Sequence, residues 1–164
     1  MKTIPLTQGK FAIVDDCDFE WLNQWKWIAT WDEKRDYWRV VRKEDKETIY
    51  MHRAILGLEK NDGIKSDHKD HNGLNNQRYN LRKCTDTQNR YNQKPQRWHS
   101  SKYKGVSWSK KEKRWKARIT YNSKDYRLGC YKNEIDAAKV YDIAAKKLFG
   151  EFAYLNFPKE KQNG

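Results

Sequence analysis

The sequence predicts an α+β protein built from two small parts, and three observations support this. Short runs that alternate apolar and polar residues, bounded by Asn, Gly and Asp, are typical of strands in small antiparallel sheets. The run between Asn133 and Gly150 instead repeats apolar residues every three or four positions, which is the pattern of a helix that covers a sheet. The charge is also uneven, because residues 1–94 carry +3 of the net +13 and residues 95–164 carry +10. A weakly charged first part is therefore followed by a strongly basic second part.

The composition restricts the partners and the compartment. A chain of 164 residues with a pI of about 9.6 is expected to bind a polyanion, and the concentration of charge in its second part favours nucleic acid over a membrane. No apolar run approaches the roughly 18 residues of a membrane-spanning helix, and no signal-peptide pattern opens the chain. We therefore expect a cytoplasmic protein with no membrane partner.

The cysteines do not form a metal-binding pattern. Cys17, Cys84 and Cys130 lie far apart in the sequence and include no Cys-x-x-Cys pair. We therefore expect free thiols and no structural zinc.

Residues 1–62 are expected to form a small β-rich segment. A strand-like run at 10–14 leads into a short helix that Asp18 would cap. The aromatic-rich runs 25–31 and 37–41 alternate like two strands joined by a polar loop.

Several tryptophans fall in or beside these runs. Stacking on bases is one interpretation, but aromatic residues at alternating positions of a small sheet favour a role in its core. The residues assigned to packing are Trp21, Trp25, Trp27, Trp31 and Trp38.

The stretch from Asp67 to Arg82 is the strongest candidate for a site. It gathers acids, imidazoles and carboxamides around Asn72-Gly73, with little besides Leu74 and Leu81 to bury. Asn-Gly favours a turn with positive φ. Packing does not account for this composition, so the stretch predicts a functional site. Within it, His71 is expected to be a solvated turn residue rather than a metal ligand, and Asn75 and Asn76 are expected to brace the loop.

The residue types in this stretch suit the hydrolysis of a phosphodiester. His68 offers an imidazole with an ordinary pKa near 6.5, which fits a general base that takes a proton from water. Asp67 and Asn89 offer oxygen ligands for a hard cation such as Mg²⁺ or Mn²⁺. Asn80 would bind the other ring nitrogen of His68 and orient it. Thr85 with Gln88 predicts a capping box that fixes the helix bearing Asn89.

The order Asp-His, Asn-Leu and Gln-Asn between residues 64 and 92 resembles the HNH nuclease motif. That resemblance implies a ββα unit, here residues 63–94, which holds one divalent metal ion against a DNA phosphate. It implies that Asp67 and Asn89 are metal ligands, that His68 is the general base and that Asn80 orients it. Asn89 stands where many HNH proteins carry a final histidine. The preceding segment, with His52 in a structural role, resembles the corresponding part of phage HNH proteins.

The second part predicts a three-stranded antiparallel sheet and one helix. Strands are expected at 104–109, 114–121 and 124–131, and Asn133 would cap the helix that ends at Gly150. Its apolar stripe consists of Ile135, Ala138, Tyr141, Ala145 and Leu148.

This part resembles an AP2/ERF DNA-binding domain over residues 101–158. The shared motifs are Tyr103-Lys104-Gly105-Val106, Trp115-Lys116-Ala117-Arg118-Ile119, Leu128-Gly129, Ala137-Ala138-Lys139-Val140-Tyr141-Asp142, Ala144-Ala145 and Leu155-Asn156-Phe157-Pro158. Residues 95–100 are then a linker and residues 159–164 a tail.

The resemblance implies that the exposed face of the sheet binds the major groove of double-stranded DNA. The implicated residues are Lys104, Ser107, Ser109, Lys116, Arg118, Thr120 and Arg127. Arginine side chains at Arg118 and Arg127 suit guanine edges, whereas Lys116 suits phosphate. Lys104, Ser107 and Ser109 differ from the arginines common in that family, so no base preference is transferred.

The combined pattern predicts a metal-dependent DNA endonuclease similar to phage-borne HNH homing endonucleases, active as a monomer or homodimer in a bacterial or phage-infected cell. The alternative is a DNA-binding transcriptional regulator with an inactive nuclease fold. A third class is an RNA-binding module. It is disfavoured because recognition of a wide major groove by the face of a sheet suits duplex DNA.

Overall fold

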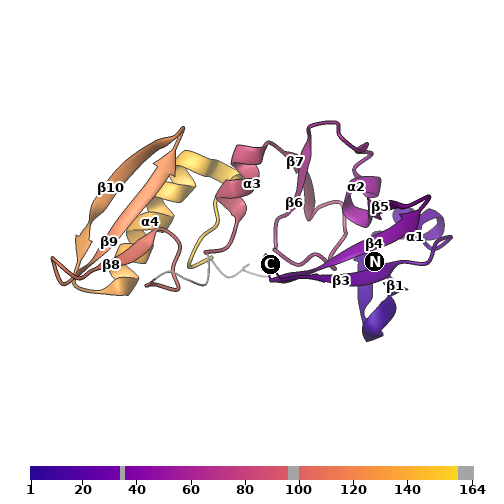
Figure 1. Ribbon diagram of the computed structural model, residues 1–164, viewed down its shortest axis with the longest axis horizontal. Coiled ribbons are helices and arrows are strands. Elements are labelled where there is room, and N and C mark those ends of the chain that lie inside the picture. The colour runs from indigo at the N-terminus through magenta and orange to yellow at the C-terminus, as the bar shows by residue number, and fades with distance from the viewer. Residues whose placement is uncertain (34–35, 96–99, 159–164) are drawn as a thin grey trace. The chain divides into compact units, whose positions relative to one another are not determined.

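The computed structural model describes residues 1–33, 36–95 and 100–158. The chain divides into two compact units, Met1–Asn89 (unit 1) and Arg90–Gly164 (unit 2). Several small antiparallel sheets alternate with helices, an arrangement compatible with the expected α+β class (Figure 1). Most of the expected linker and all of the expected tail, residues 96–99 and 159–164, lie outside the described residues. Among the described residues, no helix is both long and apolar enough to cross a membrane.

Unit 1 contains three small sheets and short helices. Its first elements are β1 (Lys2–Pro5), η1 (Thr7–Gly9), β2 (Phe11–Val14), α1 (Asp16–Leu22), β3 (Ile28–Asp32), β4 (Tyr37–Glu44) and β5 (Glu47–Tyr50). They are followed by α2 (Met51–Ile55), β6 (Lys65–His68), β7 (Leu81–Cys84) and α3 (Asp86–Asn92), whose residues from Arg90 onward belong to unit 2. β1 pairs with β2, β4 pairs with both β3 and β5, and β6 pairs with β7. The strand expected at 10–14 is present as β2, whereas β1 and β5 were not predicted.

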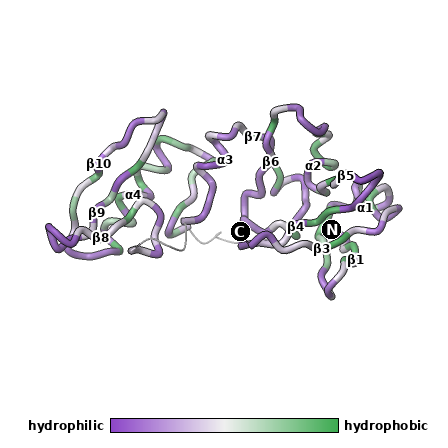
Figure 2. The backbone as a smooth tube through the Cα atoms, viewed as in Figure 1, coloured by the Kyte–Doolittle hydropathy of each residue, from purple (hydrophilic) through white to green (hydrophobic). Residues whose placement is uncertain are grey.

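The core of unit 1 joins these sheets. Hydrophobic residues occur along β1 to β4 (Figure 2). The buried core residues are Ile4, Ala12, Val14, Leu22, Trp27, Val40, Met51, Ile55 and Leu81. Leu81, the first residue of β7, ties the β6–β7 hairpin to the rest of the unit. Burial of a side chain of this size stabilises the fold by about 2 kcal/mol.

Two tryptophan assignments and one helix cap were wrong. Trp25 and Trp31 are 36% and 45% exposed. Trp25 precedes β3 and lies outside the strands, and Trp31 lies in β3, an outer strand of its sheet. Asp15, not Asp18, occupies the position that precedes α1. Asp18 lies inside the helix, where it is buried and bound by Arg78.

Unit 2 matches the predicted order of elements closely. β8 (Val106–Ser109), β9 (Arg114–Tyr121) and β10 (Lys124–Tyr131) form an antiparallel sheet with β9 at its centre. α4 (Glu134–Phe149) lies against this sheet and is followed by η2 (Gly150–Phe152) (Figure 1). The turn between β8 and β9 is hydrophilic (Figure 2).

Capping and packing explain the position of α4. The Asn133 side chain accepts a bond from the Ile135 amide at 2.8 Å, and Gly150 ends the helix with φ of +56°. Ala138, Tyr141 and Ala145 are buried as predicted. Ile135 is 42% exposed, so its assignment to the apolar stripe was wrong: it lies in the first turn, at the margin of the sheet.

Candidate functional site

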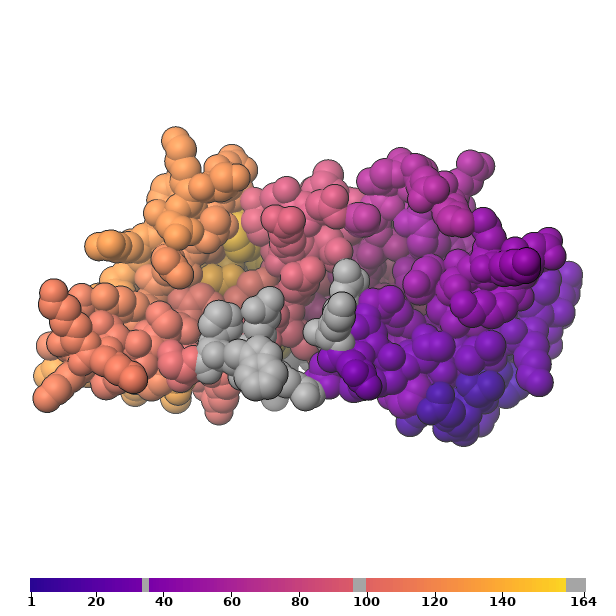
Figure 3. All heavy atoms as spheres, in the orientation of Figure 1, coloured from indigo at the N-terminus to yellow at the C-terminus, as the bar shows by residue number. Residues whose placement is uncertain are grey.

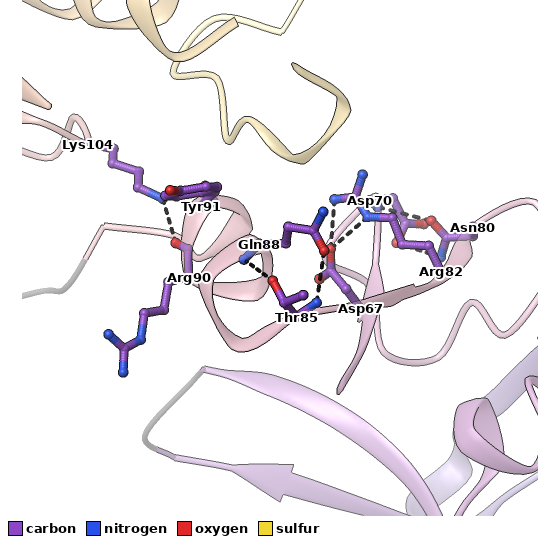
Figure 4. Close-up of polar contacts among 9 residues, drawn as sticks. All are labelled: Asp67, Asp70, Asn80, Arg82, Thr85, Gln88, Arg90, Tyr91 and Lys104. Carbon is purple, nitrogen blue, oxygen red and sulfur yellow. Dashed lines mark hydrogen bonds and ion pairs between the residues drawn. The ribbon is translucent and has the colours of Figure 1, made fainter. Parts of the chain in front are cut away.

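Asp67 and His68 are adjacent residues of β6, and the β6–β7 ladder sets their neighbours. Asp67 is paired with Arg82, and His68 with Leu81. The guanidinium of Arg82 donates to Oδ2 of Asp67 from Nε at 3.0 Å and from Nη2 at 2.7 Å (Figure 4). Both side chains are nearly buried, with exposed fractions of 10% and 9%. The Arg82 guanidinium therefore fixes the direction of the Asp67 carboxylate.

His68 is buried, and Asn76 fixes its tautomer. Nε2 of His68 lies 3.3 Å from Oδ1 of Asn76. Because Nδ2 of Asn76 donates to the Gly73 carbonyl, its Oδ1 is the atom that faces the ring. Nε2 is then the donor, which leaves the basic lone pair on Nδ1. Burial lowers the pKa of His68 from 6.5, while Asn76, Asp70 and Asp67 act in the opposite direction.

His52 packs against the same imidazole. This residue of α2 lies edge-on to His68, with ring centroids 4.9 Å apart and an interplanar angle of 69°. The pKa of His52 lies well below its usual range. Burial is the main cause, and the charges of His68, Arg53 and Arg39 lower it further. A neutral ring therefore limits the orientations open to His68.

Asn80 has a different partner from the one expected. Its side-chain oxygen accepts from the Asp70 amide at 3.0 Å, and its Nδ2 donates to Oδ1 of Asp70 and to the Asn75 carbonyl, both at 2.8 Å. Asn75 also donates to Oδ2 of Asp70 at 2.8 Å. Asn80 thus joins the two ends of the loop between β6 and β7 (Figure 4), and it is Asn76 that contacts His68.

The same loop is anchored to α1 and β2. Oδ2 of Asp15 accepts from the Arg78 amide at 2.8 Å, and Asp18 binds the Arg78 guanidinium through two bonds of 2.7 Å. The Ile13 amide donates to the Leu74 carbonyl, and the Asn76 amide donates to the Ile13 carbonyl at 2.7 Å. Much of the polar composition that predicted a site is therefore explained by hydrogen bonds that fix the loop.

Gly73 is required for a reason other than a turn with positive φ. In this loop His71, with φ of +60°, adopts the left-handed conformation. A Cβ atom at Gly73 would lie 1.9 Å from the Trp38 carbonyl oxygen and 2.8 Å from the Tyr37 ring. The loop therefore approaches β4 at a distance that only glycine permits.

Asn89 is the middle residue of α3, the helix that follows the β6–β7 hairpin. The predicted capping box is present: Gln88 donates its amide to Oγ1 of Thr85 at 3.1 Å, and the Thr85 amide donates to Oε1 of Gln88 at 2.9 Å (Figure 4). The Asn89 amide donates to the Thr85 carbonyl at 2.9 Å. Asn89 is therefore held on a capped first turn.

The candidate ligand atoms are oxygens, which is the type of ligand that a hard cation prefers. Asp67 offers a carboxylate and Asn89 a carboxamide, and Mg²⁺ commonly takes one or two protein oxygens and completes its shell with water and phosphate. A cation bound there would share the Asp67 carboxylate with Arg82. In the part of the chain that the structure describes, no three His, Cys, Asp or Glu side chains gather as a zinc site would require.

The outer face of the unit 2 sheet carries most of the predicted DNA-binding residues. Ser107, Arg118, Thr120 and Arg127 are exposed, and Ser109 and Lys116 are half-buried. Arg118 lies directly opposite Arg127 across β9 and β10. Asp125 binds Arg118 at 3.3 Å and also accepts from Thr120. Figure 3 shows side chains of β9 and β10 (orange) at the surface of the molecule. The guanidinium groups of Arg118 and Arg127 repel each other. A bound polyanion would offset this repulsion, so the pair suits such a partner.

Lys104 is not on that face. Its ammonium donates to the carbonyl oxygens of Arg90, Tyr91 and Gln93 at 3.2, 2.7 and 2.7 Å (Figure 4). The resemblance to an AP2/ERF domain implied a DNA-binding role for Lys104, but this residue precedes β8 and its side chain turns to these carbonyls instead.

A mimivirus protein resembles nearly the whole chain. An HNH endonuclease of Acanthamoeba polyphaga mimivirus, L560, whose name describes it as uncharacterized, is 33% identical over 153 residues, which is 91% of this chain and 76% of the relative. The chain belongs to the HNH endonuclease family. The predicted nuclease motif in residues 63–94 falls within a family resemblance that extends across both units.

A second relative matches only part of this HNH family member. The AP2-like ethylene-responsive transcription factor PLT2 of Arabidopsis thaliana is 43% identical over 60 residues, or 35% of this chain and 11% of the plant protein. No family model matches the chain. No solved structure matches it either.

Sequence reasoning missed three contacts of the candidate site. Arg82 binds Asp67, Asn76 contacts Nε2 of His68, and His52 packs on the His68 ring. A signal for Arg82 was present, since a charged residue between Leu81 and Cys84 in a short buried strand requires a partner. No local pattern indicates His52, because it approaches His68 only through the tertiary fold.

Proposed function

We propose that this HNH family member is a site-directed, metal-dependent DNA endonuclease of the homing type. The observation that carries the proposal is the His68 ring, which Asn76 and His52 hold next in the strand to Asp67, the partner of Arg82. A buried base next to a fixed carboxylate suits the hydrolysis of a phosphodiester.

In this proposal His68 is the general base. Nδ1 takes the proton from the attacking water, while Asn76 keeps the hydrogen on Nε2. The lowered pKa of His68 keeps the ring neutral at pH 7, so the base is ready without prior loss of a proton. Asn80 supports this arrangement indirectly, since its bonds to Asp70 and Asn75 hold the loop that carries Asn76.

Asp67 and Asn89 would hold one divalent ion. Mg²⁺ is the expected ion and Mn²⁺ is the alternative. When bound, such an ion stabilises the charge that develops on the phosphate oxygens. Arg82 holds the Asp67 carboxylate in a fixed direction, and it would share that carboxylate with the ion.

The outer face of the unit 2 sheet would bind the target DNA. Arg118 and Arg127 could each form two bonds to a guanine edge, and Lys116 could bind phosphate. The partial similarity to a plant transcription factor supports this role.

The direct test is the nicking of supercoiled plasmid DNA that contains candidate target sites. Purified protein is incubated with Mg²⁺, with Mn²⁺ or with EDTA, and the relaxed and linear products are measured. Metal-dependent relaxation supports the proposal. Tight DNA binding without cleavage in any metal, across the candidate targets, would refute it.

The second candidate function is a DNA-binding regulator with an inactive nuclease unit. One observation favours it: Arg82 already neutralises Asp67, the only carboxylate in the proposed ligand set. A regulator would bind its target equally well with Mg²⁺ or EDTA and would leave the DNA intact.

A further inference from the structure

The end of α3 is held by residues that follow it in the chain. The last carbonyls of a helix have no partner inside the helix, and a cation near them is favourable. The Lys104 ammonium binds the carbonyl oxygens of Arg90, Tyr91 and Gln93 at 2.7 to 3.2 Å (Figure 4). Lys104 thus closes the C-terminal end of the helix that bears Asn89.

Aromatic packing holds the same end. The Tyr91 ring stacks on Phe149, with centroids 3.8 Å apart and an interplanar angle of 10°. Tyr121 stacks on Tyr91 at 6.3 Å, and the Tyr91 carbonyl also accepts from the Tyr154 amide at 3.2 Å. A helix as short as α3 is unstable by itself, so these contacts supply much of its order.

Lys104 is itself fixed on both sides of its backbone. The Lys104 amide donates to Oδ1 of Asn156 at 2.7 Å, and Nδ2 of Asn156 donates to the Lys104 carbonyl at 3.1 Å. Asp142 in turn accepts from the Asn156 amide at 2.8 Å and from its Nδ2 at 3.0 Å. A continuous chain of bonds therefore runs from α4 through Asn156 and Lys104 to the end of α3.

The charge of Lys104 is maintained at neutral pH. Burial lowers the pKa of Lys104 to about 8. The three carbonyl oxygens favour the protonated form, because an ammonium supplies one donor to each. The side chain also passes over the Tyr154 ring, with Nζ 5.5 Å from the centroid, and such an ammonium is attracted to the ring.

We propose that Lys104 is a positioning residue of the nuclease, which sets the direction of the Asn89 side chain by holding the end of α3. The proposal rests on the proposed function, in which Asn89 is a metal ligand. It also reassigns Lys104, which the AP2/ERF resemblance placed among the DNA-binding residues. A displacement of a ligand by about 1 Å is enough to slow a reaction about a hundredfold.

The test compares Lys104→Met and Lys104→Arg with Lys139→Met, the matched loss of an exposed lysine from α4. DNA affinity is measured in EDTA, nicking is measured at saturating DNA, and hydrogen exchange is measured over residues 86–92. Lys104→Met should slow nicking about tenfold to a hundredfold, keep DNA affinity within about twofold and raise exchange in α3 about tenfold. Lys104→Arg should recover most of both losses, because its guanidinium also reaches the carbonyls. Lys139→Met should match the wild type.

Two results would overturn the proposal. The first is a weaker DNA affinity with unchanged nicking at saturating DNA, since that identifies Lys104 as a DNA contact. The second is unchanged exchange in α3. If Lys104→Met does not fold, Lys104→Gln, which is too short to reach the carbonyls, takes its place with the same expected results. A wild-type protein that does not nick DNA refutes the proposed function, and exchange then still decides whether Lys104 holds α3.

Discussion

The Arg82 guanidinium binds Oδ2 of Asp67 through two donors, at 2.7 and 3.0 Å, and both side chains are nearly buried. A bound cation would compete for the same carboxylate, yet removal of Arg82 alone would leave a buried charge without a partner. Arg82→Gln should therefore destabilise the metal-free protein by about 3 kcal/mol. Mg²⁺ should restore part of that loss, because it binds only the folded state.

Thermal unfolding of both proteins in EDTA and in Mg²⁺ measures this effect. The wild type should gain less from Mg²⁺ than the variant does. An equal gain would show that Arg82 and the cation do not share Asp67.

Two buried histidines predict how stability depends on pH. The pKa of His68 is lowered from 6.5, and that of His52 lies well below it, in both cases first through burial. Below about pH 6.5 the unfolded chain therefore binds more protons than the folded chain. Stability should be fully present above that pH and should fall as the pH falls.

The variant His52→Phe keeps a ring against His68 and removes one titrating group. Urea unfolding at a series of pH values between 5 and 7.5 should give a shallower fall for this variant than for the wild type. Parallel curves would show that His52 does not contribute to the acid sensitivity.

Gly73→Ala should destabilise unit 1, because the new Cβ would lie 1.9 Å from a backbone oxygen of Trp38. Overpacking of this kind costs about 3 kcal/mol. Gly57→Ala is the control, since no atom lies within 4 Å of its Cβ and only its φ of +60° is strained, at about 1 kcal/mol. Chemical unfolding compares the two variants. Equal losses would mean that the loop withdraws from β4 without penalty.

The Arg118 and Arg127 pair predicts opposite effects on stability and binding. Arg127→Thr removes a like charge directly opposite Arg118, so it should stabilise the sheet by a few tenths of a kcal/mol. It should also weaken DNA binding by about tenfold if Arg127 binds a base edge. Unfolding and DNA titrations at several salt concentrations measure both. Unchanged affinity would remove Arg127 from the DNA surface.

The regular elements were the most predictable from sequence. The alternation in β9, the Thr85 and Gln88 capping box and the Asn133 cap each depend on neighbours within a few residues, and each is present in the structure. Trp25 and Trp31 were misassigned because the alternation of residues shows neither that the strand begins only at Ile28 nor that it is an outer strand of its sheet.

The detailed contacts of the candidate site were not predictable in the same way. His52 meets His68, and Lys104 meets the end of α3, only after strands distant in sequence have paired and packed. Asn76 and Asn80 have the same type of side chain, and only the folded loop decides that Asn76 contacts His68 while Asn80 holds Asp70.

The central claim is that His68 is the general base of a DNA endonuclease, and single-turnover nicking by His68→Ala tests it most directly. Plasmid cleavage in Mg²⁺ is compared with that of the wild type at DNA concentrations that saturate both proteins, and DNA affinity is measured in EDTA. A cleavage rate at least about a hundredfold lower is predicted, with DNA affinity within about twofold. A His68→Ala variant that cleaves at the wild-type rate would contradict the account.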